Sequence, residues 1–129
     1  MSSPSKYVLQ GSFDVPADTW AAAKAEVRAV LIQRAKHRAM IPYSELVGLV
    51  NSVNFNAYDQ RLFAMLGQVS IEEDENGRPL LSVLVVHKNG DVKPGPGFFE
   101  LAASLGRDTR DADKAWIAET QKVYQYWNK

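Results

Sequence analysis

Residues 78–99 read RPLLSVLVVHKNGDVKPGPGFF and form the most distinctive stretch of this 129-residue sequence. Residues 79–88 read as a strand, and residues 80–86 are almost continuously apolar, which is typical of a strand covered on both faces. Asn89-Gly90 is a strong signal for a tight hairpin turn. The two prolines and two glycines of residues 94–97 then restrict the returning segment to one stiff path. We therefore predict a β-hairpin with a basic tip, in which replacement of Gly97 by valine destabilises the fold.

Two helical patterns lead up to this stretch. Pro16 stands next to acidic residues, as is common in the first turn of a helix. Apolar residues at spacings of three and four then predict one long amphipathic helix over residues 14–37. Pro42 interrupts the pattern, and Ser44 is expected to cap a short second helix that ends near residue 50.

The rest of the chain also reads as mostly helical. Asn56 is expected to cap a third helix over residues 56–69, in which Gln68 points to solvent, and an acidic turn follows at residues 72–77. After the hairpin, apolar residues predict a short helix that ends at Gly106. Further elements are an aromatic C-terminal helix over residues 111–129 and an N-terminal arm or edge strand over residues 1–13, flanking a core of residues 14–110.

Length and composition favour one soluble domain over residues 1–129. The 15 basic and 15 acidic residues balance, so a general attraction to nucleic acid is not expected. Basic residues outnumber acidic ones before residue 40, and the reverse holds over residues 41–90. The absence of cysteine excludes disulfides and thiol chemistry, and the absence of a long apolar run predicts a cytoplasmic protein that does not enter a membrane.

The order helix, short helix, helix, hairpin resembles a winged helix-turn-helix domain, an α+β fold. Residues 41–50, IPYSELVGLV, are followed by a predicted helix and an Asn-Gly hairpin, and this order over roughly residues 40–99 is loosely similar to the DNA-binding half of alkyltransferase-like proteins. Those proteins carry a Tyr-x-Glu-Leu/Val segment ahead of their recognition helix. The Pro-Cys-His-Arg signature of that family is absent here. The resemblance therefore implies a fold and no alkyl transfer, and a fold by itself does not carry a function over.

A winged-helix reading implies binding of double-stranded DNA by a non-catalytic regulator. Helix 56–69 would enter the major groove, the hairpin tip 88–93 would meet phosphates, and the basic end of the first helix would add backbone contacts. Glutamates and aspartates at residues 72–75 oppose this reading, because phosphates repel them. The expected nucleic-acid contacts are Arg34, Lys36, Arg38, Asn56, Gln60, Arg61, Lys88 and Lys93.

A protein-interaction module, or a subunit of a larger bacterial or phage assembly, is the alternative interpretation. It relies on the PGPGFF loop and on aromatic residues of the C-terminal helix, since aromatic side chains are enriched at interface centres. The expected partner contacts are Trp116, Tyr124 and Trp127, although the same side chains can instead close the core.

Catalysis is not expected from this sequence. His37 and His87 are its only histidines, and His87 follows an apolar run in which a structural imidazole is commoner than a general base. The carboxylates of residues 72–75 lack the spacing of a calcium loop, and Gly95-x-Gly97 lacks the third glycine of a dinucleotide fingerprint. The sequence therefore predicts no catalytic residue, no metal site and no cofactor.

Overall fold

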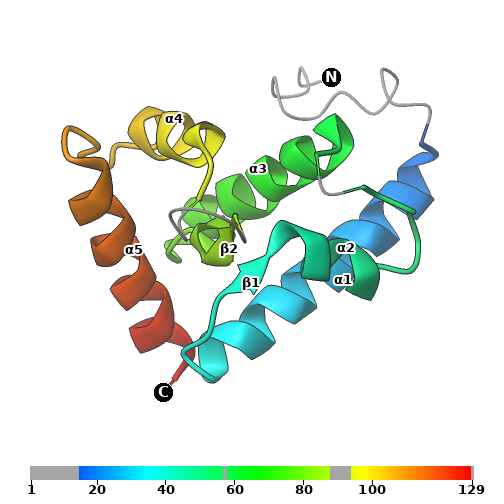
Figure 1. The fold of residues 1–129 in the computed structure, drawn as a ribbon, viewed down its shortest axis with the longest axis horizontal. Helices are drawn as coiled ribbons and strands as arrows, with labels where there is room; N and C mark the ends of the chain where they lie inside the picture. Colours follow the sequence, from blue (N-terminus) through cyan, green and yellow to red (C-terminus); the bar gives the residue numbers. More distant parts are fainter. Residues whose placement is uncertain (1–14, 57, 88–93, 129) are drawn as a thin grey trace.

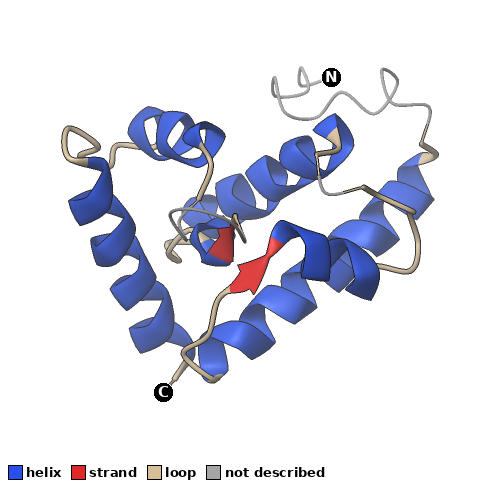
Figure 2. Ribbon diagram, in the orientation of Figure 1, coloured by secondary structure: helices blue, strands red, loops and turns tan. Residues whose placement is uncertain are grey.

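The computed structural model describes residues 15–56, 58–87 and 94–128 (Figure 1). Within them the chain forms an α+β fold that is mostly helical, with one small two-stranded sheet near its centre (Figure 2). The helices and strands are α1 (Ala17–Lys36), β1 (Ile41–Pro42), α2 (Tyr43–Leu49), α3 (Gln60–Glu75), the 3₁₀-helix η2 (Leu81–Leu84), β2 (Val85–Val86), α4 (Pro96–Ser104) and α5 (Ala112–Trp127). The predicted N-terminal arm, residues 1–13, lies outside the described residues.

Helix α1 confirms the long helix expected from the apolar spacing. One stripe of its residues is fully buried: Trp20, Ala23, Val27, Leu31 and Ala35. Asp18 lies in the first turn, and Arg34 and Lys36 lie in the last, which suits the helix dipole at both ends. The helix then ends at residues 37–39, where Arg38 adopts a left-handed φ of 52°.

The predicted strand and hairpin are wrong for the part that the structure describes. Residues 81–84 form a 3₁₀-helix, and only Val85–Val86 is extended. This short strand pairs in parallel with β1, Ile41 facing Val85 and Pro42 facing Val86. A short apolar run indicates burial but does not distinguish a strand from a buried helical turn. Here η2 is buried between α1, α3 and α5, which explains why the whole run is apolar. The Asn89-Gly90 turn lies outside the described residues.

Helix α3 is shifted along the chain relative to its prediction. Asp59 caps it instead of Asn56, accepting a hydrogen bond from the backbone N–H of Arg61. The helix then continues to Glu75, through residues expected to form an acidic turn. All residues from 65 to 70 are buried, so this part of α3 is a core helix with no solvent-facing side. Gln68 is therefore buried too, and its side-chain oxygen accepts a hydrogen bond of 2.9 Å from Trp20 Nε1.

The segment that starts at Pro94 leads into a helix, because Pro96 begins α4 at a position that suits proline. The predicted short helix before Gly106 and the predicted C-terminal helix are confirmed, and Asp111 caps the latter. Nothing in the structure requires glycine at position 97, because its φ is not left-handed and a Cβ placed on it meets no atom within 4 Å. No helix among residues 15–56, 58–87 and 94–128 is long and apolar enough to cross a membrane.

Candidate binding cavity between α3 and α4

Two arginines expected to contact DNA have internal partners in the structure. Arg34 on α1 forms an ion pair with Glu45 of α2 and donates to the backbone oxygen of Met40. Arg61 on α3 forms an ion pair of 2.6 Å with Asp59, and its guanidinium lies 5.4 Å from the ring centroid of Phe55. Much of the positive charge of both side chains is therefore already compensated within the protein.

The other predicted nucleic-acid contacts that the structure describes do not come together on one face. Lys36 and Arg38 are exposed at the end of α1, close to the C-terminus in Figure 1. Gln60 and Arg61 start α3, beside the opposite end of α1 in the same view. Asn56 is exposed, and its side-chain oxygen accepts a hydrogen bond from the Tyr58 backbone. Lys88 and Lys93 lie outside the described residues.

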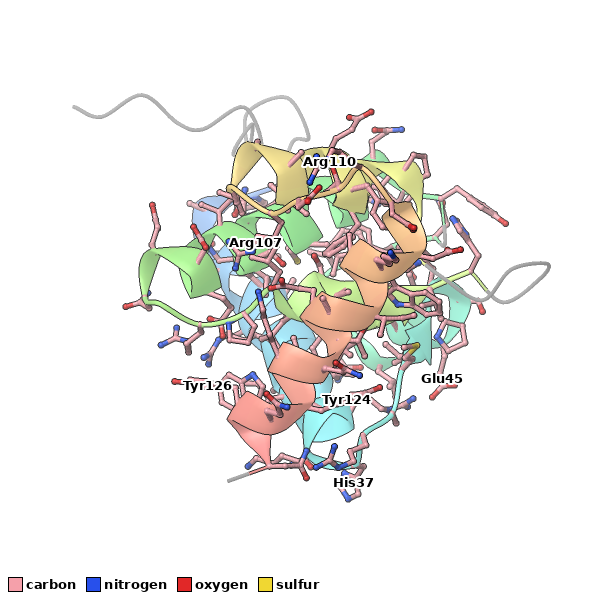
Figure 3. All side chains as sticks on the ribbon, turned by 90° about the vertical axis from the view of Figure 1, so that its left-hand side faces the viewer. His37, Glu45, Arg107, Arg110, Tyr124 and Tyr126 are labelled. Atoms are coloured by element: carbon pink, nitrogen blue, oxygen red, sulfur yellow. The ribbon has the colours of Figure 1, made fainter. Side chains whose placement is uncertain are left out.

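The predicted partner contacts on α5 are half-buried and pack against the hydrophobic core (Figure 3 labels Tyr124). Trp127 also lies under the guanidinium of Arg28, 5.6 Å from its ring centroid. Burial raises the pKa of the Tyr124 hydroxyl, and the nearby positive charge of Arg38 partly offsets this increase. Trp116, Tyr124 and Trp127 thus hold α5 on the domain.

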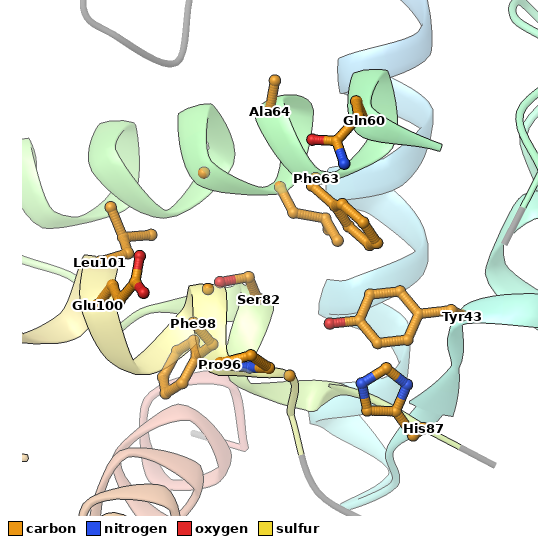
Figure 4. Close-up of a pocket in the computed structure, with 14 residues that line it drawn as sticks. Tyr43, Gln60, Phe63, Ala64, Ser82, His87, Pro96, Phe98, Glu100 and Leu101 are labelled. Carbon is orange, nitrogen blue, oxygen red and sulfur yellow. The ribbon is translucent and has the colours of Figure 1, made fainter. Parts of the chain in front are cut away.

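The structure instead presents a cavity of about 520 Å³ between α3 and α4. This volume is in the range of ligand sites in proteins. Figure 4 shows the cavity with side chains from α2, α3, η2 and α4 around it. The residues that line it are Tyr43, Gln60, Phe63, Ala64, Leu66, Gly67, Ser82, His87, Gly95, Pro96, Gly97, Phe98, Glu100 and Leu101.

Three rings form one wall of this cavity. Tyr43 starts α2, and its ring meets that of Phe63 edge to face, with centroids 5.7 Å apart. His87, just after β2, packs on the other side of Tyr43 at 5.0 Å with the rings tilted by 41°. In Figure 4 the Tyr43 hydroxyl points into the cavity. Burial raises the pKa of this hydroxyl, and a hydrogen bond with the backbone of Gly95 partly offsets the increase.

Gly95 is the residue that allows these rings to approach the start of α4. A Cβ at this position would lie 3.0 Å from His87 Nε2 and 3.7 Å from the Tyr43 hydroxyl oxygen. The first distance is shorter than carbon and nitrogen normally tolerate, whereas the backbone angles of Gly95 suit any residue. Its role is therefore to leave space for a side chain, and this is the position in the PGPG segment where a larger residue meets a neighbour.

The polar groups of the cavity divide into a fixed inner group and an exposed rim. Ser82 on η2 is held in place, since its hydroxyl lies 2.7 Å from that of Ser70 and its backbone N–H donates to Ser70 Oγ. Gln60 and Glu100 are exposed at the rim. Among the described lining residues, Glu100 is the only carboxylate, and none is a lysine or an arginine.

Sequence patterns alone do not identify this cavity. The PGPGFF loop is unusual in the sequence, and four of its residues line the cavity: Gly95, Pro96, Gly97 and Phe98. Tyr43, however, reads as part of the break between two helices, Phe63 lies within the predicted third helix, and His87 reads as part of a strand. No group of three or more metal-ligating side chains occurs in the part of the chain that the structure describes.

Comparisons with known proteins add no relative. No family model matches the chain, and the searches of curated proteins and of solved structures find no similar protein. The residues and their geometry are therefore the basis for a functional proposal.

Proposed function

We propose that this protein is a non-catalytic binding protein that holds a planar aromatic ligand in the cavity between α3 and α4. The observation that carries the proposal is the meeting of Tyr43, Phe63 and His87 at a cavity that Gly95 keeps open. Cavities with mostly apolar walls and a few fixed polar groups are the usual form of small-molecule sites.

An aromatic ligand fits the walls better than an aliphatic one. Flat rings pack edge to face or offset against tyrosine and phenylalanine, which adds about 0.5–1.5 kcal/mol to simple burial. Phe63 is 36% exposed, so its outer face is free to meet a ligand at the mouth. The Tyr43 hydroxyl, together with the amide of Gln60 at the rim, offers hydrogen bonds that orient a ring nitrogen or hydroxyl.

We expect Gly95→Ala to weaken binding of an indole probe by about tenfold, which corresponds to about 1.4 kcal/mol. The added methyl group would lie 3.0 Å from His87 Nε2, so the imidazole must shift and the ring wall of the cavity changes shape. The same crowding should lower the free energy of unfolding by about 1–2 kcal/mol. Isothermal titration calorimetry gives the affinity, and urea denaturation gives the stability.

Gly48→Ala is the matched control. Gly48 is an exposed α2 residue that does not line the cavity, and a methyl group added to it would meet no atom within 4 Å. This variant should keep the probe affinity and raise stability by up to about 1 kcal/mol. Failure of the native protein to bind indole or related rings at millimolar concentration would contradict the proposed function.

Nucleic-acid binding is the second function that we propose, and the backbone of Arg38 is the observation that favours it. Arg38 occupies the left-handed position that ends α1, where the Ala39 N–H reaches the Arg34 carbonyl at 2.9 Å. Glycine is the usual residue at this position, so arginine lowers the stability of the protein by about 1 kcal/mol relative to glycine. The Arg38 side chain is exposed and has no carboxylate partner among the described residues. Helices α1 to α3 follow the order of a helix-turn-helix domain, and a winged-helix fold remains part of this second proposal.

For this second function, the double variant Lys36→Ala/Arg38→Gly should bind a DNA duplex about tenfold more weakly at low salt. The slope of log K against log salt concentration should fall in magnitude by about two, one for each lost phosphate contact. Arg38→Gly alone should raise the stability of the protein by about 0.5–1 kcal/mol. Lys114→Ala, which removes an exposed lysine on α5, serves as the control in a duplex mobility-shift assay. If all variants shift the duplex to the same extent as the native protein, Lys36 and Arg38 do not form a DNA-binding site.

A further inference from the structure

We propose that the ligand of the α3–α4 cavity is a small aromatic amine whose ring lies against Tyr43 and Phe63 and whose ammonium group is bound by Glu100. This inference rests on the proposed aromatic site and adds the charge of the ligand. It is carried by the distribution of charge around the cavity, which is independent of the aromatic contacts.

Glu100 lies on α4 at the mouth of the cavity and has no cationic partner among the described residues. Most other carboxylates near the core are paired, such as Glu73 with Arg28 and Arg78, and Glu119 with Arg107. A positively charged ligand would supply the cationic partner of Glu100 that the described residues do not provide. A negatively charged ligand would meet a carboxylate with no lysine or arginine in the described lining to compensate it.

The two recognition elements lie at opposite ends of the cavity. Figure 4 shows the rings of Tyr43 and Phe63 at one end and the Glu100 carboxylate at the other, with Ser82 and Pro96 between them. A ligand that satisfies both ends has a ring and an amine joined by a short flexible chain. A cavity of about 520 Å³ has ample room for such a molecule.

Glu100 is exposed at the rim of the cavity, so water reaches the expected ion pair. An exposed pair is worth little, because solvent screens it and two mobile side chains must be ordered. A ring anchored in the cavity already fixes most of the ligand, so the ammonium is presented to Glu100 at a high effective concentration. The charge contribution should therefore be measurable as a ratio of affinities between matched ligands.

Three indoles with the same ring and different charge test this inference: tryptamine, the neutral alcohol tryptophol, and indole-3-propionate. Titration calorimetry at about pH 8, where the amine is protonated, should give tryptamine about tenfold higher affinity than tryptophol, and propionate the lowest. In Glu100→Gln the ratio of tryptamine to tryptophol affinity should fall to about one. Glu75→Gln, at the exposed end of α3 and outside the cavity lining, should keep the ratio of the native protein.

The outcomes separate this inference from the proposed function. Equal binding of all three indoles would overturn the amine assignment and leave the aromatic site in place. Binding of none would overturn both. A tryptamine preference that survives Glu100→Gln would overturn the role of Glu100.

Discussion

Replacement of Trp20 by alanine is expected to cost about 3–5 kcal/mol of folding free energy. Trp20 is fully buried on α1 and is the largest side chain in the core. Its indole N–H donates a hydrogen bond of 2.9 Å to the side-chain oxygen of Gln68, itself buried on α3. The substitution removes the ring, leaves a cavity between the two helices and takes away a donor that Gln68 uses. A cost of this size is a large fraction of the stability of a single domain, and urea denaturation would measure it.

Phenylalanine substitutions separate the role of the Trp20 ring from that of its N–H group. Trp20→Phe keeps a ring but leaves Gln68 with one donor fewer, so we expect a loss of about 2 kcal/mol. Trp116 on α5 is the matched control, because its indole N–H is buried and has no hydrogen-bond partner among the residues that the structure describes. Trp116→Phe loses no hydrogen bond and should cost clearly less than Trp20→Phe. Equal costs for the two phenylalanine variants would show that the Trp20–Gln68 hydrogen bond contributes nothing.

Helix positions are predictable from the sequence wherever one face is apolar and the other polar. The stripe of Trp20, Val27 and Leu31 identifies α1, which begins at Ala17 and not at residue 14, and the C-terminal helix is also placed correctly. The pattern fails where an element is buried on all sides. In residues 65–70 of α3 the apolar pattern wrongly indicates a solvent face for Gln68, which is buried. Residues 81–84 of η2 show no polar face at all and therefore read as a strand.

The cavity is less predictable than the helices, because its residues come from separate elements. Tyr43 starts α2, Phe63 lies on α3, Ser82 on η2 and Glu100 on α4. Their proximity depends on how the helices pack, and no local pattern encodes that arrangement. The ion pairs of Arg34 and Arg61 escape prediction for a related reason: the sequence shows a basic residue but not the carboxylate that folding places beside it.

Glu73→Gln is expected to lower stability by about 2 kcal/mol near neutral pH. The Glu73 carboxylate is 1% exposed and joins α1 to the segment after α3, because it accepts hydrogen bonds from Arg28 Nε at 3.1 Å and from Arg78 Nε and Nη2 at 3.0 and 2.9 Å. A glutamine keeps the shape but not the charge, and it turns an N–H₂ group towards two guanidinium groups. Loss of one partner from a buried ion pair commonly costs about 3–5 kcal/mol, and the partial exposure of both arginines reduces this figure.

The effect of Glu73→Gln should depend on pH. Burial acts to raise the pKa of Glu73, but hydrogen bonds and charges from Arg78 and Arg28 outweigh it, so the pKa in the folded protein lies below its usual value. The unfolded chain therefore binds a proton first as pH falls, and the stabilisation by Glu73 is present above the unfolded pKa and is lost as pH falls through the folded one. The stability difference between the native protein and Glu73→Gln should accordingly shrink below about pH 4.

Glu45→Gln is the control, because it removes a half-exposed carboxylate paired with Arg34, and it should change stability by less than about 1 kcal/mol. A difference for Glu73→Gln that stays constant between about pH 6 and pH 3 would contradict the assigned charge of this carboxylate.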